Sequence, residues 1–192
     1  MSTVRAYKRS PALTNSRWYK GMLASQIASP ADNNGAFDLT IAKLRRGTEP
    51  PPHVHSRDDE LFYILSGEIT FYVDGEVFTT RAGECMFLPR QKPHGWLITS
   101  EEVHGILLVT PGGFNDAIYK MSVPAKRMDV PSDAESVTYA NAELTQTIQL
   151  FEQYGIRFLT PDEIRAHMPE YPAAAKAASA HDRRLQSAHT LR

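Results

Sequence analysis

Short apolar segments separated by turn residues run along the chain from about Trp18 to Val109. Closely spaced turns between such segments are typical of an antiparallel β-sandwich or β-barrel. The clearest unit is residues 68–80, in which alternate apolar residues share one face and Asp74 and Gly75 supply the positive φ angles of a two-residue turn. We therefore expect two antiparallel strands joined by a tight hairpin here.

Further strands are expected where a short apolar run is bounded by Gly, Pro, Asn or Asp. The expected strands are residues 19–27, 37–44, 94–98 and 103–109, together with one that begins at Glu60. The sequence thus predicts an all-β sandwich or barrel domain over residues 18–111, preceded by an N-terminal arm at residues 1–17.

Helical periodicity begins only after the Pro-Gly-Gly stretch at 111–113. The residues spaced for one helix face are Leu144, Ile148, Phe151 and Tyr154, between a candidate N-cap at Asn141 and a candidate helix end at Gly155. Residues 160–163 read Thr-Pro-Asp-Glu, the pattern of a capping box. We expect residues 112–172 to form a helical segment that packs on the barrel. The Ala-rich tail at 173–192 has no apolar stripe and is expected to be peripheral.

Composition narrows the possible partners. The 192 residues include 21 basic and 22 acidic side chains, for a net charge of −1, so nothing favours binding to nucleic acid. The apolar runs are much shorter than the roughly 18–20 residues that cross a bilayer, and no signal peptide is readable, so no membrane association is expected. A single Cys excludes an intramolecular disulfide and a thiolate metal cluster. We expect a cytoplasmic protein that acts on a small molecule.

Four residues that could carry chemistry lie on predicted strands or at their starts. Within a strand, His53 and His55 point to the same side because side chains alternate, so two imidazoles converge. Glu60 opens the next strand, and His94 begins a later one after a proline-bounded loop. Three imidazoles and one carboxylate make a site for a divalent metal of borderline softness.

This spacing resembles the cupin superfamily. The first cupin motif reads Gly, five residues, His-x-His, three or four residues, Glu, six residues, Gly. Its fixed positions are filled here by Gly47, His53, His55, Glu60 and Gly67. In the second motif Gly83, Pro89 and His94 are present, whereas Gln91 replaces a Gly and Ile98 replaces an Asn. The resemblance implies a jelly-roll β-barrel like that of small bacterial single-domain cupins related to quercetin 2,3-dioxygenase.

Alternation also predicts the surroundings of the metal. Phe62 and Ile64 share the face of Glu60, and Trp96 and Ile98 share that of His94. These four residues would line an apolar, aromatic cavity, which is either a substrate pocket or an ordinary packed core.

The neighbouring positions raise two open questions. Leu61, Tyr63 and Leu65 would point outward although they are apolar, so a second sheet, the C-terminal helices or another subunit must cover them. The resemblance favours a homodimer. Asp58 and Asp59 are expected in a solvated turn, although either could hydrogen-bond a ligand imidazole.

Four protein ligands leave two positions open on a six-coordinate metal. We expect one divalent transition metal (Fe, Mn, Ni, Co, Cu or Zn) and, because the chain has no Gly-x-Gly-x-x-Gly turn, no organic cofactor. The resemblance implies a quercetinase-like dioxygenase acting on a small apolar aromatic or enolic substrate, with Glu60 as general base. A metal-dependent isomerase, lyase or decarboxylase and a non-enzymatic binding or sensor barrel remain as alternatives.

Overall fold

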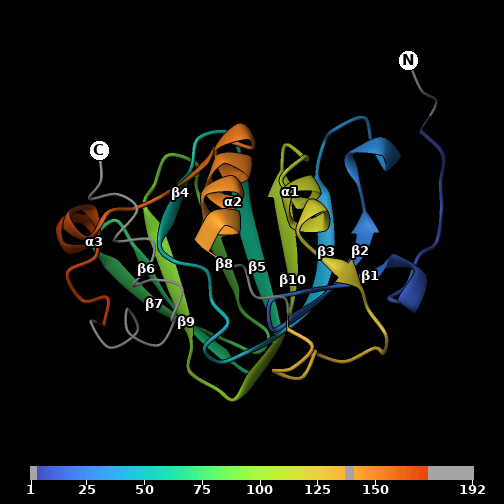
Figure 1. Ribbon diagram of the computed structural model, residues 1–192, viewed down its shortest axis with the longest axis horizontal. Coiled ribbons are helices and arrows are strands. Elements are labelled where there is room, and N and C mark those ends of the chain that lie inside the picture. Colours follow the sequence, from blue (N-terminus) through green and yellow to red (C-terminus); the bar gives the residue numbers. More distant parts are fainter. Residues whose placement is uncertain (1–3, 137–140, 173–192) are drawn as a thin grey trace.

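The computed structural model describes residues 4–136 and 141–172. Two antiparallel β-sheets face each other and enclose an apolar core (Figure 1). In hydrogen-bonded order, the first sheet consists of β11 (Val123–Pro124), β1 (Ser16–Tyr19), β2 (Met22–Ala28), β3 (Asp38–Arg45), β10 (Glu102–Thr110), β5 (Asp59–Ser66) and β8 (Cys85–Leu88). The second sheet consists of β12 (Ile156–Phe158), β4 (His53–His55), β9 (His94–Ile98), β6 (Glu68–Val73) and β7 (Glu76–Arg81). The jelly-roll β-barrel expected from the sequence is confirmed.

The helices lie outside the barrel. α1 (Asn115–Lys120) and α2 (Asn141–Gln153) pack against each other, whereas α3 (Pro161–His167) lies beside the second sheet (Figure 1). Two short 3-10 helices, η1 (Leu13–Asn15) and η2 (Pro30–Asp32), flank the first two strands. No helix among the described residues is long and apolar enough to span a membrane.

The core forms where the inner faces of the two sheets meet. β3 alternates between buried and half-buried residues, so one of its faces lies inside the barrel. Ile64, Ile69 and Phe71 are completely buried, and Phe62 packs edge-to-face on Phe71 with 5.3 Å between ring centroids. Aromatic pairs of this kind contribute about 0.5–1.5 kcal/mol beyond their buried area. This packing fixes the strands from which the candidate site residues project.

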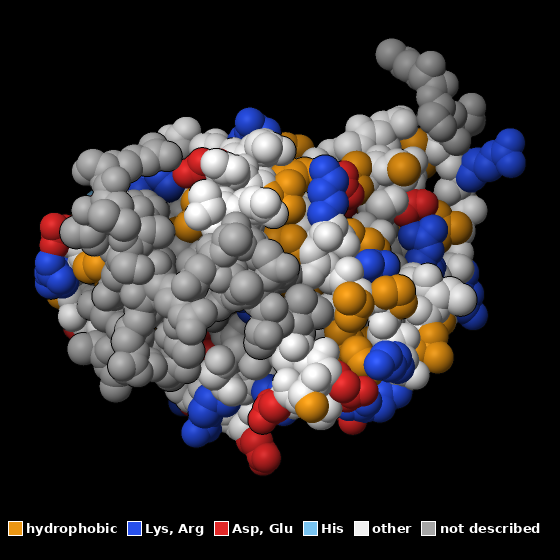
Figure 2. Space-filling model, viewed as in Figure 1, with side chains coloured by type: hydrophobic (Ala, Val, Ile, Leu, Met, Phe, Trp, Pro, Cys, Tyr) orange, Lys and Arg blue, Asp and Glu red, His pale blue; other side chains and the backbone are white. Residues whose placement is uncertain are grey.

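The predicted hairpin is confirmed as β6 and β7. Asp74 has a φ of 44° and Gly75 a φ of 94°, the left-handed conformations that a tight two-residue turn requires. The face shown in Figure 2 carries positive and negative side chains interspersed with hydrophobic ones, in keeping with the nearly balanced charge of the chain.

The structure departs from the predicted strands in three respects. The expected strand at 19–27 is divided, because a turn separates β1, which ends at Tyr19, from β2. In this turn Lys20 has a φ of 50°, and only glycine fits at position 21, where a Cβ would clash with Thr48. β8, β11 and β12 were not predicted. β1 also starts at Ser16, two residues before the expected beginning of the barrel.

The C-terminal helices agree with the helical periodicity. α2 ends two residues before Gly155, which has a φ of 83°. α3 is capped by Thr160, whose hydroxyl accepts the backbone N–H of Glu163 while its own N–H donates to the Glu163 carboxylate. The predicted tail at 173–192 lies outside the described residues.

Candidate metal centre

The structure brings the four predicted ligand residues together inside the barrel. His53 and His55 are both buried on β4, Glu60 is on β5 of the opposite sheet, and His94 is the first residue of β9. β4 pairs with β9 through His53 and His94. One ligand atom from each residue lies within 4.8 Å of the others, so the His/Glu cluster fits a single divalent metal ion.

Backbone carbonyls orient two of the imidazoles. The Nδ1–H of His53 donates to the carbonyl oxygen of Pro51 at 2.9 Å, and that of His94 donates to the carbonyl of Lys92 at 3.0 Å. Their Nε2 atoms then approach each other to 3.3 Å, and Nε2 of His94 lies 3.5 Å from Glu60 Oε2. Such outer hydrogen bonds fix the tautomer that leaves Nε2 free to coordinate.

His55 provides the clearest sign that a cation belongs here. Both of its ring nitrogens are buried without a hydrogen-bond partner, with Nε2 3.7 Å from Glu60 Oε1 and Nδ1 3.7 Å from Asp58 Oδ2. Buried polar atoms are rarely left unpaired, because each one costs free energy. A metal ion between these side chains would satisfy the Nε2 atom.

Asp58 is not in a solvated turn, contrary to the first expectation. Its side chain is buried beside His55, and its Oδ2 has no hydrogen-bond partner. Asp59 instead faces the surface and forms a bidentate ion pair with Arg90. The alternative, a carboxylate that supports a ligand imidazole, is therefore favoured for Asp58.

The electrostatics of the cluster favour the metal-binding forms of Glu60 and His53, but the protonated form of His55. Burial opposes charge on Glu60, but His55 and His94 outweigh it and lower the pKa of Glu60 to about 2. Burial, reinforced by the other two imidazoles, lowers the pKa of His53 well below its usual value. The pKa of His55 is raised, because Glu60 and Asp58 outweigh its burial. Glu60 is thus an anion and His53 a neutral ligand.

The departure at Gln91 leaves the loop before His94 intact. Gln91 has a φ of 65°, the left-handed conformation that glycine adopts most easily, and its N–H donates to the carbonyl of His55 at 2.7 Å. The loop therefore keeps a glycine-like turn with a residue that is strained there.

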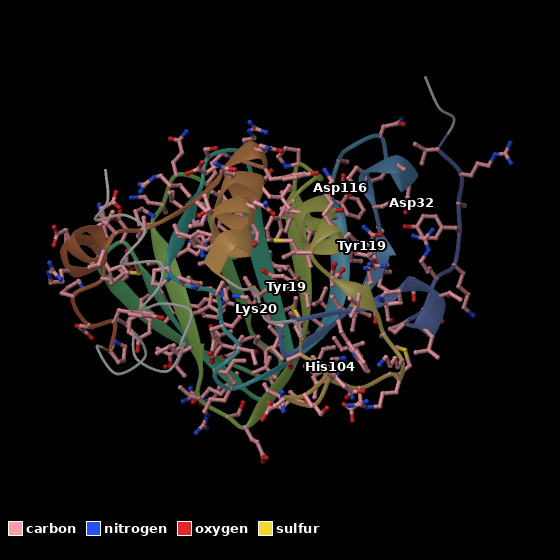
Figure 3. The ribbon with its side chains drawn as sticks, viewed as in Figure 1. Tyr19, Lys20, Asp32, His104, Asp116 and Tyr119 are labelled. Atoms are coloured by element: carbon pink, nitrogen blue, oxygen red, sulfur yellow. The ribbon has the colours of Figure 1, made fainter. Side chains whose placement is uncertain are left out.

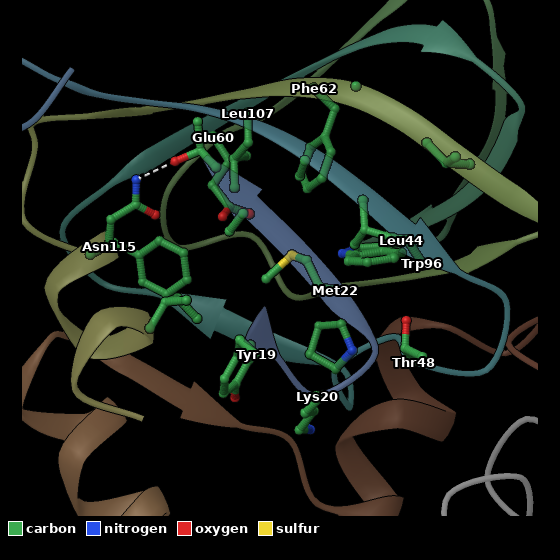
Figure 4. Close-up of a pocket in the computed structure, with 18 of the residues that line it drawn as sticks. Tyr19, Lys20, Met22, Leu44, Thr48, Glu60, Phe62, Trp96, Leu107 and Asn115 are labelled. Carbon is green, nitrogen blue, oxygen red and sulfur yellow. Dashed lines mark hydrogen bonds between the residues drawn. The ribbon is translucent and has the colours of Figure 1, made fainter. Parts of the chain in front are cut away.

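An apolar cavity of about 110 Å³ lies beside the cluster (Figure 4). His53 and Glu60 form part of its wall, so a metal held by the cluster would face the cavity. Of the residues predicted to surround the metal, Phe62, Ile64 and Trp96 line the cavity, whereas Ile98 is buried in the core and is not among the wall residues.

The C-terminal segment contributes walls that the sequence patterns did not reveal. β12 pairs with β4, which places Ile156 opposite His55 and Phe158 opposite His53. Phe114 packs edge-on against His55 with 5.3 Å between ring centroids. Phe114, Phe151, Ile156 and Phe158 all line the cavity, as do the polar residues Thr40 and Asn115. Apolar side chains after residue 113 were a signal, but they were attributed to helix packing alone.

Comparison with known proteins agrees with this geometry. The family model described as a cupin domain matches residues 40–111, which include all four clustered residues. The chain contains a cupin domain. The resemblance to quercetinase-like cupins is also confirmed at low identity: quercetin 2,3-dioxygenase of Bacillus subtilis is 20% identical over 135 residues, which cover 70% of this chain and 39% of that protein. The enzyme of the same name from Aspergillus japonicus is 27% identical over 121 residues, covering 57% of this chain and 35% of that protein.

The chain spans less than two fifths of the length of these two relatives. A solved structure, KdgF from a Halomonas species, is 22% identical with a TM-score of 0.45 and covers 50% of this chain and 84% of its own. The cupin domain matched at residues 40–111 contains the buried His/Glu cluster, which suits one divalent metal.

Proposed function

We propose that this cupin is a metal-dependent dioxygenase that acts on a small aromatic or enolic substrate. The observation that carries the proposal is the placement of the His/Glu cluster directly on an apolar cavity, through His53 and Glu60. His53, His55, Glu60 and His94 would hold the metal. When bound, a divalent metal supplies Lewis acidity that lowers the pKa of a substrate hydroxyl and an open position for a second small molecule.

Glu60 limits which substrates can react. It is the carboxylate in the cavity wall, and the neighbouring His55 and His94 lower its pKa, so it is ionised and able to accept a proton. A bound metal would lower the pKa of a coordinated substrate hydroxyl, which makes proton transfer to Glu60 easier. Glu60 therefore suits a hydroxyl that is already acidic, such as that of an enol or a phenol, better than an ordinary alcohol.

The remaining walls bind and shield such a substrate. Phe62 and Trp96 pack edge-to-face with 5.8 Å between their ring centroids and present an aromatic surface to the cavity. The phenylalanines of the C-terminal segment close the side near β4. An aromatic ring that enters this cavity gains apolar contact and excludes water from the reacting oxygen.

The test begins with the metal content of the purified chain. Elemental analysis should find one transition-metal ion per chain, lost in His94→Gln and retained in His104→Gln. His104 is a half-buried histidine on the outer face of β10, away from the cluster (Figure 3).

Oxygen consumption is then measured with catechols and β-diketones, with Glu60→Gln as the inactive control. We expect turnover that needs only metal, substrate and O₂. Product formed equally under argon would point to an isomerase, lyase or decarboxylase instead. Absence of turnover with every enolic substrate would favour a binding or sensor barrel.

A further inference from the structure

The cavity exists because one row of inward positions in the first sheet carries very small side chains. Ala24 on β2 lies opposite Ala42 on β3, and Ala42 lies opposite Gly105 on β10. All three residues line the cavity. Inward positions of a small barrel are normally filled by larger side chains, so this row leaves room that the core does not close.

The size of the cavity limits what it can hold. Its volume is about 110 Å³. A protein cavity of roughly 150 Å³ admits benzene. The cavity therefore holds at most about one ring or an open chain of similar size, and the other rings of a three-ring flavonol would lie outside it.

Two hydrogen-bonded polar residues, Asn115 and Thr40, interrupt the apolar wall at the end of the cavity where Glu60 lies (Figure 4). Asn115, the first residue of α1, is 4% exposed and donates from Nδ2 to Thr40 Oγ1 at 2.8 Å. Thr40 lies in register with Phe62, with Leu107 of β10 between them. Phe62 is the inward position next to Glu60 on β5, so the Asn115–Thr40 pair lies close to Glu60 across the sheet. The Asn115 amide has both a donor and an acceptor, and Thr40 uses only one of them.

A buried carboxylate holds Asn115 in this position. Asp38 is completely buried, and its Oδ2 accepts the backbone N–H of Gly113 at 2.7 Å and that of Asn115 at 3.3 Å. Gly112 in the same loop has no room for a side chain, since a Cβ would lie 2.8 Å from the backbone of Phe37. Burial of a carboxylate costs free energy unless the group is hydrogen-bonded. Asp38 therefore depends on the two backbone N–H groups of this loop, and these bonds hold the loop in place.

We propose that Asn115 binds a second oxygen atom of a substrate about one ring in size, whose first oxygen lies at His53 and Glu60. This inference rests on the proposed function and narrows its substrate to compact molecules with two oxygen functions, such as dihydroxybenzenes. Asn115 orients the ring, and the row of Ala24, Ala42 and Gly105 gives it space.

The test measures binding in the absence of oxygen, by calorimetry on the metal-loaded chain. The probes are phenol, catechol, resorcinol and hydroquinone, which share one ring and differ in the second hydroxyl. At least one dihydroxybenzene should bind about tenfold more tightly than phenol, the size of one hydrogen bond. Asn115→Leu and Asn115→Ala should remove this advantage while phenol affinity and metal content stay nearly unchanged, although loss of the hydrogen bond to Thr40 should lower the melting temperature.

The control is Asp116→Ala, on the next and exposed residue of α1 (Figure 3), which should retain the preference. Equal losses for phenol and the dihydroxybenzenes, or an intact preference in both Asn115 variants, would overturn the inference. Quercetin should bind at least tenfold more weakly than the best single-ring probe, and tighter binding of quercetin would refute the size limit. Because no turnover is measured, failure of oxygen consumption alone would reject the dioxygenase and leave the role of Asn115 standing.

Discussion

Asp58 and Asp59 are adjacent residues with opposite environments, which makes them a matched pair for testing the metal centre. The Asp58 carboxylate is buried 3.7 Å from Nδ1 of His55, whereas Asp59 pairs with Arg90 at the surface. Partners behind a ligand imidazole typically contribute about 10–100-fold in metal affinity. Asp58→Ala should weaken metal binding by that factor in a chelator competition, and Asp59→Ala should not. Equal effects of the two substitutions would show that Asp58 does not support His55.

We expect the stability of the fold to depend on pH through the buried carboxyl group of Asp38. Burial raises its pKa, despite the opposing hydrogen bonds from Gly113 and Asn115. The fold therefore disfavours the charged form, so the contribution of Asp38 to stability is greatest below its unfolded pKa of about 3.9 and is lost as pH rises through the folded pKa.

Asparagine at position 38 has no charge to bury. Relative to the unmodified chain, Asp38→Asn should gain free energy of unfolding as pH rises from about 4 to 7. Urea midpoints of the two proteins at each pH provide the measurement, because the titration of shared groups cancels in the difference. A difference that stays constant or falls with pH would contradict the raised pKa.

Residues that follow strand alternation could be predicted, and residues placed by loops could not. The convergence of His53 and His55 follows from the two-residue period of a strand. Asp58 sits in a turn, and Asn115 reaches the cavity only through a loop held by Asp38. The local pattern of polar and apolar residues does not predict how a loop places such side chains.

At the scale of elements, the loop before β9 carries a measurable strain. Gln91 has a φ of 65°, which costs an L-residue about 1–2 kcal/mol. Gln91→Gly relieves it and should raise the free energy of unfolding by about 1 kcal/mol relative to Gln91→Ala, in denaturant titrations of both variants. Because the His55 carbonyl accepts the N–H of residue 91 in either variant, metal content should not change. A glycine variant less stable than the alanine variant would show that the loop is not strained.

Element length explains which strands the sequence revealed. β6 and β7 are six residues each, and their turn residues are distinctive. β12 has only three residues, and its identity as a strand depends on the partner β4, about a hundred positions earlier in the chain. Long-range pairing of so short a segment leaves no periodic signal, which is why the wall that it forms over His53 was missed.

At the scale of the whole molecule, the outer face of the first sheet is apolar across four strands. One row consists of Leu39, Leu108, Leu61 and Phe87, and the next consists of Ile41, Ile106, Tyr63 and Cys85. Tyr63, Leu65 and Phe87 are 39%, 41% and 52% exposed, so no part of the chain within residues 4–136 and 141–172 covers them fully. Contiguous apolar patches of this kind usually mark an interface.

We propose that a second copy of the chain covers this face, as expected for a homodimer. A two-fold axis brings the same patch of both subunits together, so the apolar face of one subunit packs against the identical face of the other. Light scattering after size exclusion should give twice the chain mass of 21.5 kDa. Phe87→Glu places a charge in the interface and should give the monomer mass. Val77→Glu is the control, because Val77 is 42% exposed on β7, at the edge of the other sheet. A monomer mass for the unmodified chain at micromolar concentration, or equal dissociation by both substitutions, would reject this interface.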